Sequence, residues 1–254
     1  MGAFELGERV ALVTGAGRGL GRAIALALAE AGADVALGLR DKASGAGLIG
    51  EIEALGRRAL ALQMDVMDLG QSRAAIDEAI AHFGGLDILV NNAGGGMPER
   101  PVADFTEADF DHLVDFNVRS AFFLTQHAGG HMLARGRGSI INMGSQAGTV
   151  ALPGEAVYCL SKAAVAHMTK CFAVEWGKNN VRVNCVAPTF FATDGTEAML
   201  GDAAFRADVI ERIAGLHRIG QPREVGEAVV FLASDAASMI TGHTLMIDGG
   251  WTAR

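Results

Sequence analysis

The chain has 254 residues, of which half are hydrophobic and 20% are charged. This composition excludes a disordered chain and is typical of one large domain. The formal net charge is −8, with 29 acidic against 21 basic residues, so we expect no nucleic-acid partner. No apolar run approaches the roughly 20 residues of a membrane span, and no signal-peptide pattern is visible. We therefore expect a cytoplasmic protein with no membrane partner.

Short runs rich in Val, Ile and Leu alternate along the chain with longer Ala-rich stretches of helical periodicity. Strands are predicted at 9–14, 34–39, 58–63, 86–90, 139–143, 181–186 and 244–247. Helices are predicted at 20–31, 42–55, 69–83, 106–133, 156–176 and 222–234, and we expect 106–133 to bend or break near Gly129 and Gly130. Strands that are apolar on both faces and separated by helices predict an α/β fold. We expect a single-domain Rossmann-type doubly wound parallel sheet of about seven strands with helices on both faces.

A glycine-rich run, TGAGRGLG at 14–21, joins the first predicted strand to the first predicted helix. Gly15 permits a tight turn, Gly19 lets the backbone approach a pyrophosphate, and Gly21 lets the helix pack close to the strand. The helix N-terminus then offers unpaired N–H groups and a partial positive charge. A glycine pattern alone is weak, but a strand before it and a helix after it predict a dinucleotide-phosphate site.

The spacing TGxxxGxG resembles that of the short-chain dehydrogenase/reductase family. Other segments extend the resemblance over nearly the whole chain, including NNAG at 91–94, YxxxK at 158–162 and the tail at 240–250. The resemblance implies one NAD(P)-binding domain over 1–254, with a lid at about 194–216 that covers the substrate. It also implies an oxidoreductase that commonly forms a homotetramer.

The end of the second predicted strand bears on the choice of coenzyme. NAD-dependent members of the family carry an aspartate where this chain has Leu39, and the next residue is Arg40. Arg18 lies within the glycine run, and two guanidinium groups that converge suit a 2′-phosphate. We therefore expect NADP(H) to be preferred. Asp41 adds a negative charge beside Arg40, so NAD(H) use remains possible.

The resemblance implies further contacts with the cofactor. Asp65 and Val66 end the third strand, where the family places an aspartate against the adenine. Thr189 stands where the family usually has glycine, in a segment that holds the nicotinamide carboxamide. The full predicted cofactor set is Gly15, Arg18, Gly19, Leu20, Gly21, Arg40, Asp65, Val66, Asn92, Ala93, Gly94, Tyr158, Lys162, Pro188, Phe191 and Thr193.

Tyr158 and Lys162 are four residues apart on a predicted helix, so they share one face. A phenol has a pKa near about 10 in water, and an adjacent ammonium favours the phenolate, so Tyr158 is predicted to act as the acid in ketone reduction and the base in alcohol oxidation. Ser145, thirteen residues earlier, would hold the substrate oxygen. The family uses an asparagine such as Asn117 to hold a proton-relaying water. Each motif alone is common, but together in this order they predict a catalytic tetrad.

The predicted substrate residues are Ser145, Gln146, Glu155 and Tyr158, and no metal site is expected. The lid mixes apolar and charged residues, which favours a small secondary alcohol or ketone derived from a sugar, a polyol or a keto acid. A 3-oxoacyl-[acyl-carrier-protein] reductase is the alternative. Its usual docking arginines are replaced by Gly136 and Asn179, although Arg135, Arg137 and Lys178 are adjacent. A third hypothesis is a redox sensor that binds a dinucleotide but does not catalyse a reaction.

Overall fold

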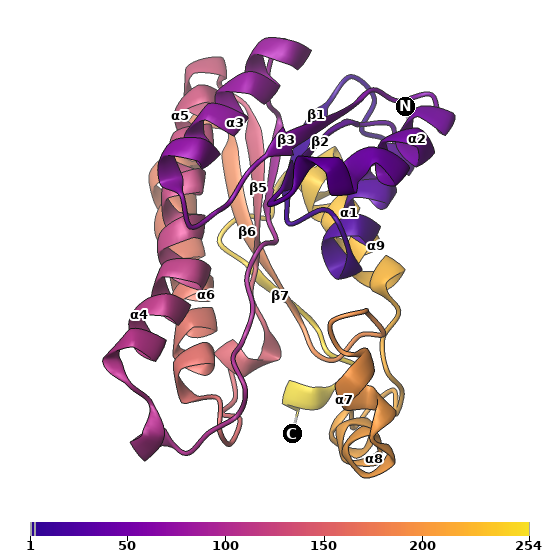
Figure 1. Ribbon diagram of the computed structural model, residues 1–254. Coiled ribbons are helices and arrows are strands. Elements are labelled where there is room, and N and C mark those ends of the chain that lie inside the picture. Colours follow the sequence, from indigo (N-terminus) through magenta and orange to yellow (C-terminus); the bar gives the residue numbers. More distant parts are fainter. Residues whose placement is uncertain (1, 3, 254) are drawn as a thin grey trace.

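The computed structural model describes residues 2 and 4–253 (Figure 1). Over these residues the chain forms one sheet of seven parallel strands in the order β3-β2-β1-β4-β5-β6-β7. The predicted parallel α/β sheet is thereby confirmed. The strands are β1 (Val10–Thr14), β2 (Asp34–Leu39), β3 (Ala59–Gln63), β4 (Ile88–Asn91), β5 (Gly138–Met143), β6 (Val181–Pro188) and β7 (Thr244–Ile247).

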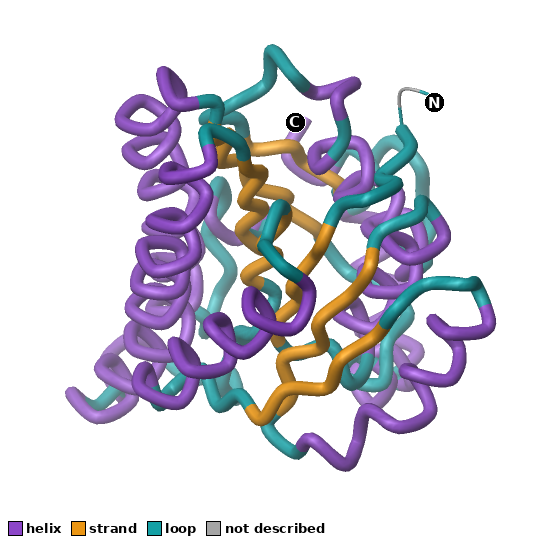
Figure 2. Tube along the Cα trace, turned by 90° about the horizontal axis from the view of Figure 1, so that it is seen from above, coloured by secondary structure: helices purple, strands orange, loops and turns teal. Residues whose placement is uncertain are grey.

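Helices cover both faces of this sheet, and the strands lie between them in the view from above (Figure 2). Helices α1, α2 and α9 form one layer, and α3, α5 and α6 belong to the other. The helices are α1 (Gly19–Glu30), α2 (Ala46–Ala54), α3 (Leu69–Phe83), α4 (Glu107–Val114), α5 (Ser120–Arg135), α6 (Ala156–Trp176), α7 (Glu197–Gly201), α8 (Ala203–Arg212) and α9 (Pro222–Ala233).

The two hydrophobic cores explain why the strand sequences are continuously apolar. Every residue of β1 and β2 is buried. Along β1, Ala11 and Val13 pack into the core beneath α1 and α9, whereas Val10 and Leu12 pack into the core beneath α3 and α5. Since alternate side chains of a strand face opposite sides, both sets must be apolar when both faces are covered.

The interruption of the long helix predicted at 106–133 lies elsewhere than expected. A π-helical turn at Asp115–Arg119 separates α4 from α5, while Gly129 lies inside an unbroken α5. The prediction of a break near Gly129 and Gly130 was therefore wrong. A Cβ at Gly129 would lie 2.3 Å from the ring of Trp176, so this glycine allows α5 to pack against α6 rather than to bend.

The strand order places a switch point beside β1. The chain adds β2 and β3 on one side of β1 and then crosses to place β4 on the other side. In a parallel sheet all carboxyl ends meet at one edge, and connections that diverge at a switch point leave a crevice there. The loops after β1, β4 and β5 should therefore meet around one cleft.

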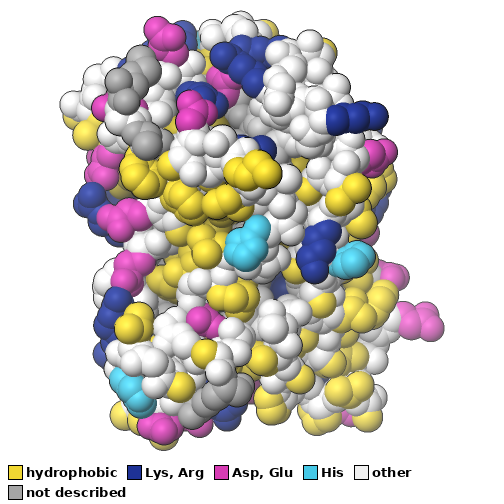
Figure 3. All heavy atoms as spheres, turned by 180° about the vertical axis from the view of Figure 1, so that it is seen from behind, with side chains coloured by type: hydrophobic (Ala, Val, Ile, Leu, Met, Phe, Trp, Pro, Cys, Tyr) yellow, Lys and Arg dark blue, Asp and Glu magenta, His cyan; other side chains and the backbone are white. Residues whose placement is uncertain are grey.

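The surface retains apolar side chains. Figure 3 shows them gathered in a patch on the face opposite to that of Figure 1, with most charged groups nearer the outline. Among the described residues, Val174 and Met239 are the most exposed large hydrophobic side chains, at 87% and 96%. The homotetramer implied by the resemblance stays a prediction. None of the described helices combines the length and the apolarity that a bilayer crossing requires.

Candidate active site

A cleft of about 700 Å³ opens at the carboxyl ends of the central strands, where the switch point places it. Residues from the glycine run, from the ends of five strands and from α6 line it together. The structure thus brings most of the predicted site residues to one place. Those that line the cleft are Gly15, Arg18, Gly19, Leu20, Gly21, Arg40, Asp65, Val66, Asn92, Ala93, Gly94, Ser145, Tyr158, Lys162, Pro188 and Thr193.

The glycine run adopts a conformation that residues with a side chain seldom adopt. Gly15 and Gly19 have φ of +65° and +55°, and a Cβ on Gly21 would lie 2.2 Å from the Gly15 carbonyl oxygen. At the start of α1, Arg18 makes no side-chain capping bond and the first turn has no acidic residue. The helix start therefore keeps its N–H groups available to an anion, as the pyrophosphate of a dinucleotide requires.

Two arginines stand at one end of this cleft. The side chains of Arg18 and Arg40 are exposed, and within the described residues neither guanidinium pairs with a carboxylate. The Asp41 carboxylate instead accepts a hydrogen bond of 3.0 Å from the Ala43 N–H, and the Asp41 carbonyl accepts one of 2.6 Å from Ser44. Unpaired guanidinium groups beside a hydroxyl fit the 2′-phosphate of NADP.

Thr14 and two asparagines hold the NNAG segment in place. The Thr14 hydroxyl accepts hydrogen bonds from the backbone N–H groups of Asn92 and Ala93, at 3.0 and 2.9 Å. The Asn92 amide donates to the Thr14 carbonyl at 2.8 Å. Asn91 reaches Asn142 of β5 at 2.8 Å within the core. Sequence reasoning did not assign these positioning roles to Thr14, Asn91 and Asn142, although each lies in or beside a motif that it used.

Lys162 is buried behind Tyr158, at the opposite end of the cleft from the arginines. Its Nζ donates a hydrogen bond of 3.0 Å to the Met143 carbonyl and lies 5.7 Å from the centroid of the Tyr158 ring. Burial removes the hydration of the ammonium and lowers the pKa of Lys162 to about 8. The lysine thus lies within electrostatic reach of the phenol, as their spacing on one helix predicted.

The pKa of Tyr158 departs from the sequence-based expectation. We expected the neighbouring ammonium, together with the positive nicotinamide ring of an oxidised coenzyme, to lower it, whereas burial raises the pKa of Tyr158 to about 12 in the folded chain. A hydrogen bond with Ser145 opposes this rise, and the carboxylate of Glu155 adds to it. Loss of hydration is therefore the larger effect on the phenolate. The chain by itself holds Tyr158 as a neutral proton donor.

Ser145 begins a short 3-10 turn directly after β5. Its hydroxyl accepts a hydrogen bond of 3.1 Å from the Ala147 N–H and donates one of 2.7 Å to the side-chain oxygen of Gln146. Both Ser145 and Gln146 are buried. The backbone thus fixes the position of the Ser145 oxygen, and Gln146 sets the direction of its proton.

Asn117 lies in the π-helical turn and does not line the cleft. Its amide nitrogen donates to the Gly95 carbonyl at 2.9 Å and to Ser161 at 3.1 Å, and its oxygen accepts from the Gly95 N–H at 2.9 Å. A Cβ on Gly94 would lie 2.7 Å from this oxygen and 3.2 Å from Lys162 Nζ. Asn117 therefore clamps the loop after β4 beside the lysine.

Three other predicted site residues also lie outside the lining of the cleft, namely Gln146, Glu155 and Phe191. The ring of Phe191 is buried against Gly220, where a Cβ would lie 2.3 Å from it. Such a distant packing partner leaves no signal near Phe191 in the sequence. Sequence reasoning also missed several lining residues, most of them neighbours of its motifs: Gly17, Ser44, Met64, Met67, Gly95, His112, Phe116, Met143, Gly144 and Gly195.

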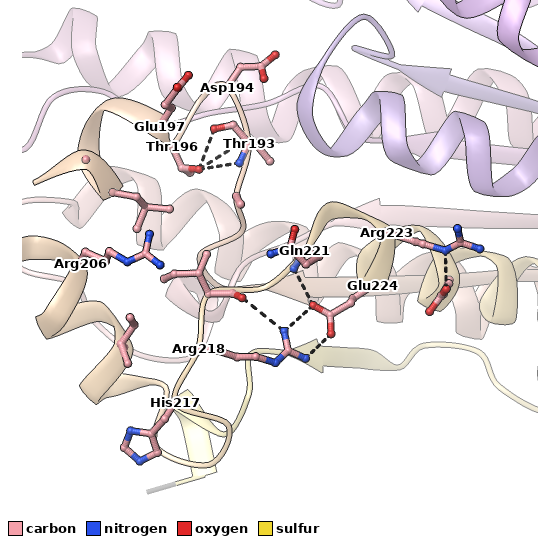
Figure 4. Close-up of a pocket in the computed structure, with 16 residues that line it drawn as sticks. Thr193, Asp194, Thr196, Glu197, Arg206, His217, Arg218, Gln221, Arg223 and Glu224 are labelled. Atoms are coloured by element: carbon pink, nitrogen blue, oxygen red, sulfur yellow. Dashed lines mark hydrogen bonds and ion pairs between the residues drawn. The ribbon is translucent and has the colours of Figure 1, made fainter. Parts of the chain in front are cut away.

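A second, larger hollow of about 1260 Å³ lies between the expected lid at 194–216 and the start of α9 (Figure 4). Figure 4 shows Arg218 directed at Glu224, with which it forms an ion pair, and Arg223 bonds Glu227 at 2.9 Å. Thr193 lines both hollows, but no residue of the predicted tetrad reaches this one. Ser145, Tyr158 and Lys162 of that tetrad line the smaller cleft instead.

Comparison with known proteins extends over nearly the full chain. Residues 15–252 match a family model described as enoyl-(acyl carrier protein) reductase. A 2-dehydro-3-deoxy-D-gluconate 5-dehydrogenase of Escherichia coli is 39% identical over 260 residues, which cover 100% of this chain and 99% of the relative. A D-threitol dehydrogenase of Mycolicibacterium smegmatis is 40% identical over 264 residues, covering 99% and 95%. The crystal structure of a gluconate 5-dehydrogenase from Burkholderia cenocepacia J2315 in complex with NADP and tartrate is 38% identical, with a TM-score of 0.94 and coverage of 99% and 98%.

Proposed function

Because the chain belongs to the short-chain dehydrogenase/reductase family, whose members act on CH–OH groups with NAD(P), we propose that it interconverts a secondary alcohol and a ketone of a small polyhydroxylated compound. The observation that carries this proposal is the convergence of Ser145, Tyr158 and Lys162 at one end of the cleft. The glycine run and two unpaired arginines occupy the other end. This arrangement suits a dinucleotide laid along the cleft with its reactive ring beside the tyrosine.

The proposed chemistry divides between the coenzyme and the chain. When bound, the nicotinamide coenzyme supplies or accepts the hydride. Tyr158 gives its proton to the carbonyl oxygen in reduction and takes it back from the alcohol in oxidation. Ser145, whose oxygen is held by the Ala147 N–H, turns its hydroxyl proton from Gln146 to the same oxygen and fixes the position of that oxygen. The Lys162 ammonium, 5.7 Å from the centroid of the Tyr158 ring, stabilises the negative charge that the phenol gains when its proton leaves.

We propose NADP(H) as the preferred coenzyme, with NAD(H) as the weaker alternative. The support is the pair of unpaired guanidinium groups of Arg18 and Arg40 and the absence of a carboxylate at Leu39, in the described lining of the cleft. Asp41 opposes this preference by its charge, but its carboxylate is engaged by the Ala43 N–H. The similar gluconate 5-dehydrogenase was crystallised with NADP.

The acyl-carrier-protein reductase that the family model's description names is the second candidate. An acidic carrier protein would need free basic groups on the surface, and the sequence offers Arg135, Arg137 and Lys178 beside the usual docking positions. Lys178 is exposed and supports this candidate, whereas the two arginines do not. Both are directed at the buried Asp87, at 3.5 and 3.0 Å. This engagement favours the sugar or polyol substrate. A redox sensor without catalysis is disfavoured because Ser145, Tyr158 and Lys162 line one cleft together.

A substrate panel with both coenzymes tests the proposal. We expect NADP⁺ reduction with polyols or sugar derivatives, and NADPH oxidation with the corresponding ketones. Replacing Tyr158 by Phe removes only the hydroxyl, so kcat/KM should fall by about 10² to 10⁴ while NADPH binding, measured by fluorescence, is retained. Turnover that stays within tenfold of the wild type would contradict the acid–base role of Tyr158.

A further inference from the structure

The Ser145 hydroxyl gives its one proton to the neighbouring side chain. Its oxygen lies 2.7 Å from Gln146 Oε1, and an amide oxygen can only accept a hydrogen bond, so the serine is the donor. The Ala147 N–H occupies one of the two lone pairs of the Ser145 oxygen, at 3.1 Å. Ser145 therefore presents its remaining lone pair, and not its proton, to the cleft that it lines.

The backbone of the short turn after β5 holds this arrangement in place. The Gly148 N–H donates to the Ser145 carbonyl at 3.0 Å, and the Thr149 N–H donates to the Gln146 carbonyl at 2.9 Å. A Cβ on Gly148 would lie 2.9 Å from the backbone of Lys162, so the turn packs directly against α6. Ser145 and Gln146 are only 8% and 3% exposed, and water therefore has little access to the bond between them.

An alcohol and a ketone meet this serine differently. An alcohol hydroxyl can donate to the remaining lone pair of Ser145 and accept from the Tyr158 hydroxyl, which burial keeps protonated. A ketone oxygen can only accept, so it faces a lone pair at Ser145 until the serine proton turns away from Gln146. That turn breaks a buried hydrogen bond and leaves the Gln146 oxygen without its donor. Binding of the ketone bears this cost, whereas binding of the alcohol does not.

We propose that Gln146 is a positioning residue that withholds the Ser145 proton from the cleft, so that the site binds the alcohol form of its substrate more tightly than the ketone form. The inference rests on the proposed function, because it places the reacting oxygen between Ser145 and Tyr158. Gln146 does not line the cleft, so it acts through the serine. A ketone that is held weakly leaves the site readily, which suits net oxidation of the alcohol.

Binding without turnover tests this role, with threitol and its ketone erythrulose as the probes. Isothermal titration of the NADPH-saturated protein with threitol, and of the NADP⁺-saturated protein with erythrulose, gives each Kd, since neither pair can exchange a hydride. Gln146→Met removes the amide and keeps the length of the side chain. It should tighten erythrulose binding by about fivefold, the worth of one hydrogen bond, and change threitol binding by less than about twofold. Gln146→Glu keeps an acceptor in place, so it should bind erythrulose no more tightly than the wild type does.

Gln126→Met is the matched control, because this exposed glutamine lies on α5 and outside the lining of the cleft, and it should change neither Kd. Gln146→Leu repeats the test if denaturation curves show that Gln146→Met does not fold. An unchanged Kd for erythrulose, an equal shift for both probes, or absence of binding by either probe would overturn the inference. A selective gain in erythrulose binding without any NADP⁺ reduction by threitol would refute the proposed reaction and leave the role of Gln146 standing.

Discussion

Burial of the Lys162 ammonium should make the stability of this protein depend on pH. Its side chain is only 5% exposed, and its pKa in the folded chain falls from the ordinary 10.5 to about 8. Between these two values the unfolded chain binds more protons than the folded one, so the unfolding free energy rises with pH. Below about pH 8 both forms are protonated and the full cost of burial applies. Above 10.5 both are neutral and that cost is absent.

The magnitude follows from the two pKa values. At about 1.4 kcal/mol per pH unit, their difference corresponds to about 3 kcal/mol of destabilisation at neutral pH. Replacing Lys162 by Met removes the charge and keeps most of the volume. The loss of the bond to the Met143 carbonyl costs about 1 to 3 kcal/mol at every pH. Only the pH-dependent part of the difference in unfolding free energy therefore reports on the burial of the charge. Between pH 7 and pH 9.5, the unfolding free energy of the wild type should rise by about 2 kcal/mol relative to that of Lys162→Met.

Urea denaturation of both proteins at one protein concentration measures this difference, with the fluorescence of Trp176 and Trp251 as the signal. Lys170→Met is the control, because Lys170 lies exposed on the same helix and loses little hydration on folding. It should give a difference that does not vary with pH. The reasoning fails if the difference in unfolding free energy between wild type and Lys162→Met does not change with pH, or if the wild type becomes less stable than the variant as pH rises. Either result would mean that the ammonium is not desolvated.

Two further substitutions address the coenzyme end of the cleft. Arg40→Asp should shift the NADP/NAD ratio of kcat/KM toward NAD by about tenfold or more, since a carboxylate repels the 2′-phosphate and bonds ribose hydroxyls; an unchanged ratio would exclude Arg40 as a phosphate ligand. Gly21→Ala places a Cβ 2.2 Å from the Gly15 carbonyl oxygen and should weaken coenzyme binding and lower the unfolding free energy by about 1 to 3 kcal/mol. At Gly50 of α2 a Cβ would meet no atom within 4 Å, so Gly50→Ala should instead raise the unfolding free energy by up to about 1 kcal/mol. Denaturation curves that show equal effects of the two substitutions would contradict the steric argument.

The sequence predicted the features that arise from local chemistry. Alternating apolar strands and helices predicted the parallel sheet, and the strand–glycine–helix order predicted a tight turn at Gly15, where the structure has a φ of +65°. Carboxyl ends of parallel strands must meet at one edge, so residues as distant as Asn92 and Thr193 could be expected in one cleft. Motif order and topology together were sufficient for this.

Features that depend on partners distant in the chain could not be predicted. Gly129 reads as a helix breaker, but the ring of Trp176 makes it a packing position. The buried position of the Phe191 ring likewise depends on the absence of a side chain at Gly220, which is distant in the sequence. The raised pKa of Tyr158 depends on how much water the surrounding chain excludes, and a spacing of four residues from Lys162 contains no information about that.

The raised pKa of Tyr158 and the lowered pKa of Lys162 have one physical origin, which is the removal of water from the end of the cleft. Each shift favours the neutral form of its own group, so the pair resists charge on either side chain. A phenolate forms more readily here when a positive charge is close, and the Lys162 ammonium lies 5.7 Å from the centroid of the ring. Its bond to the Met143 carbonyl holds that charge behind the ring instead of in the space where a substrate oxygen would lie. This geometry suits the lysine to a supporting electrostatic role in the proposed reaction, in which Tyr158 exchanges the proton.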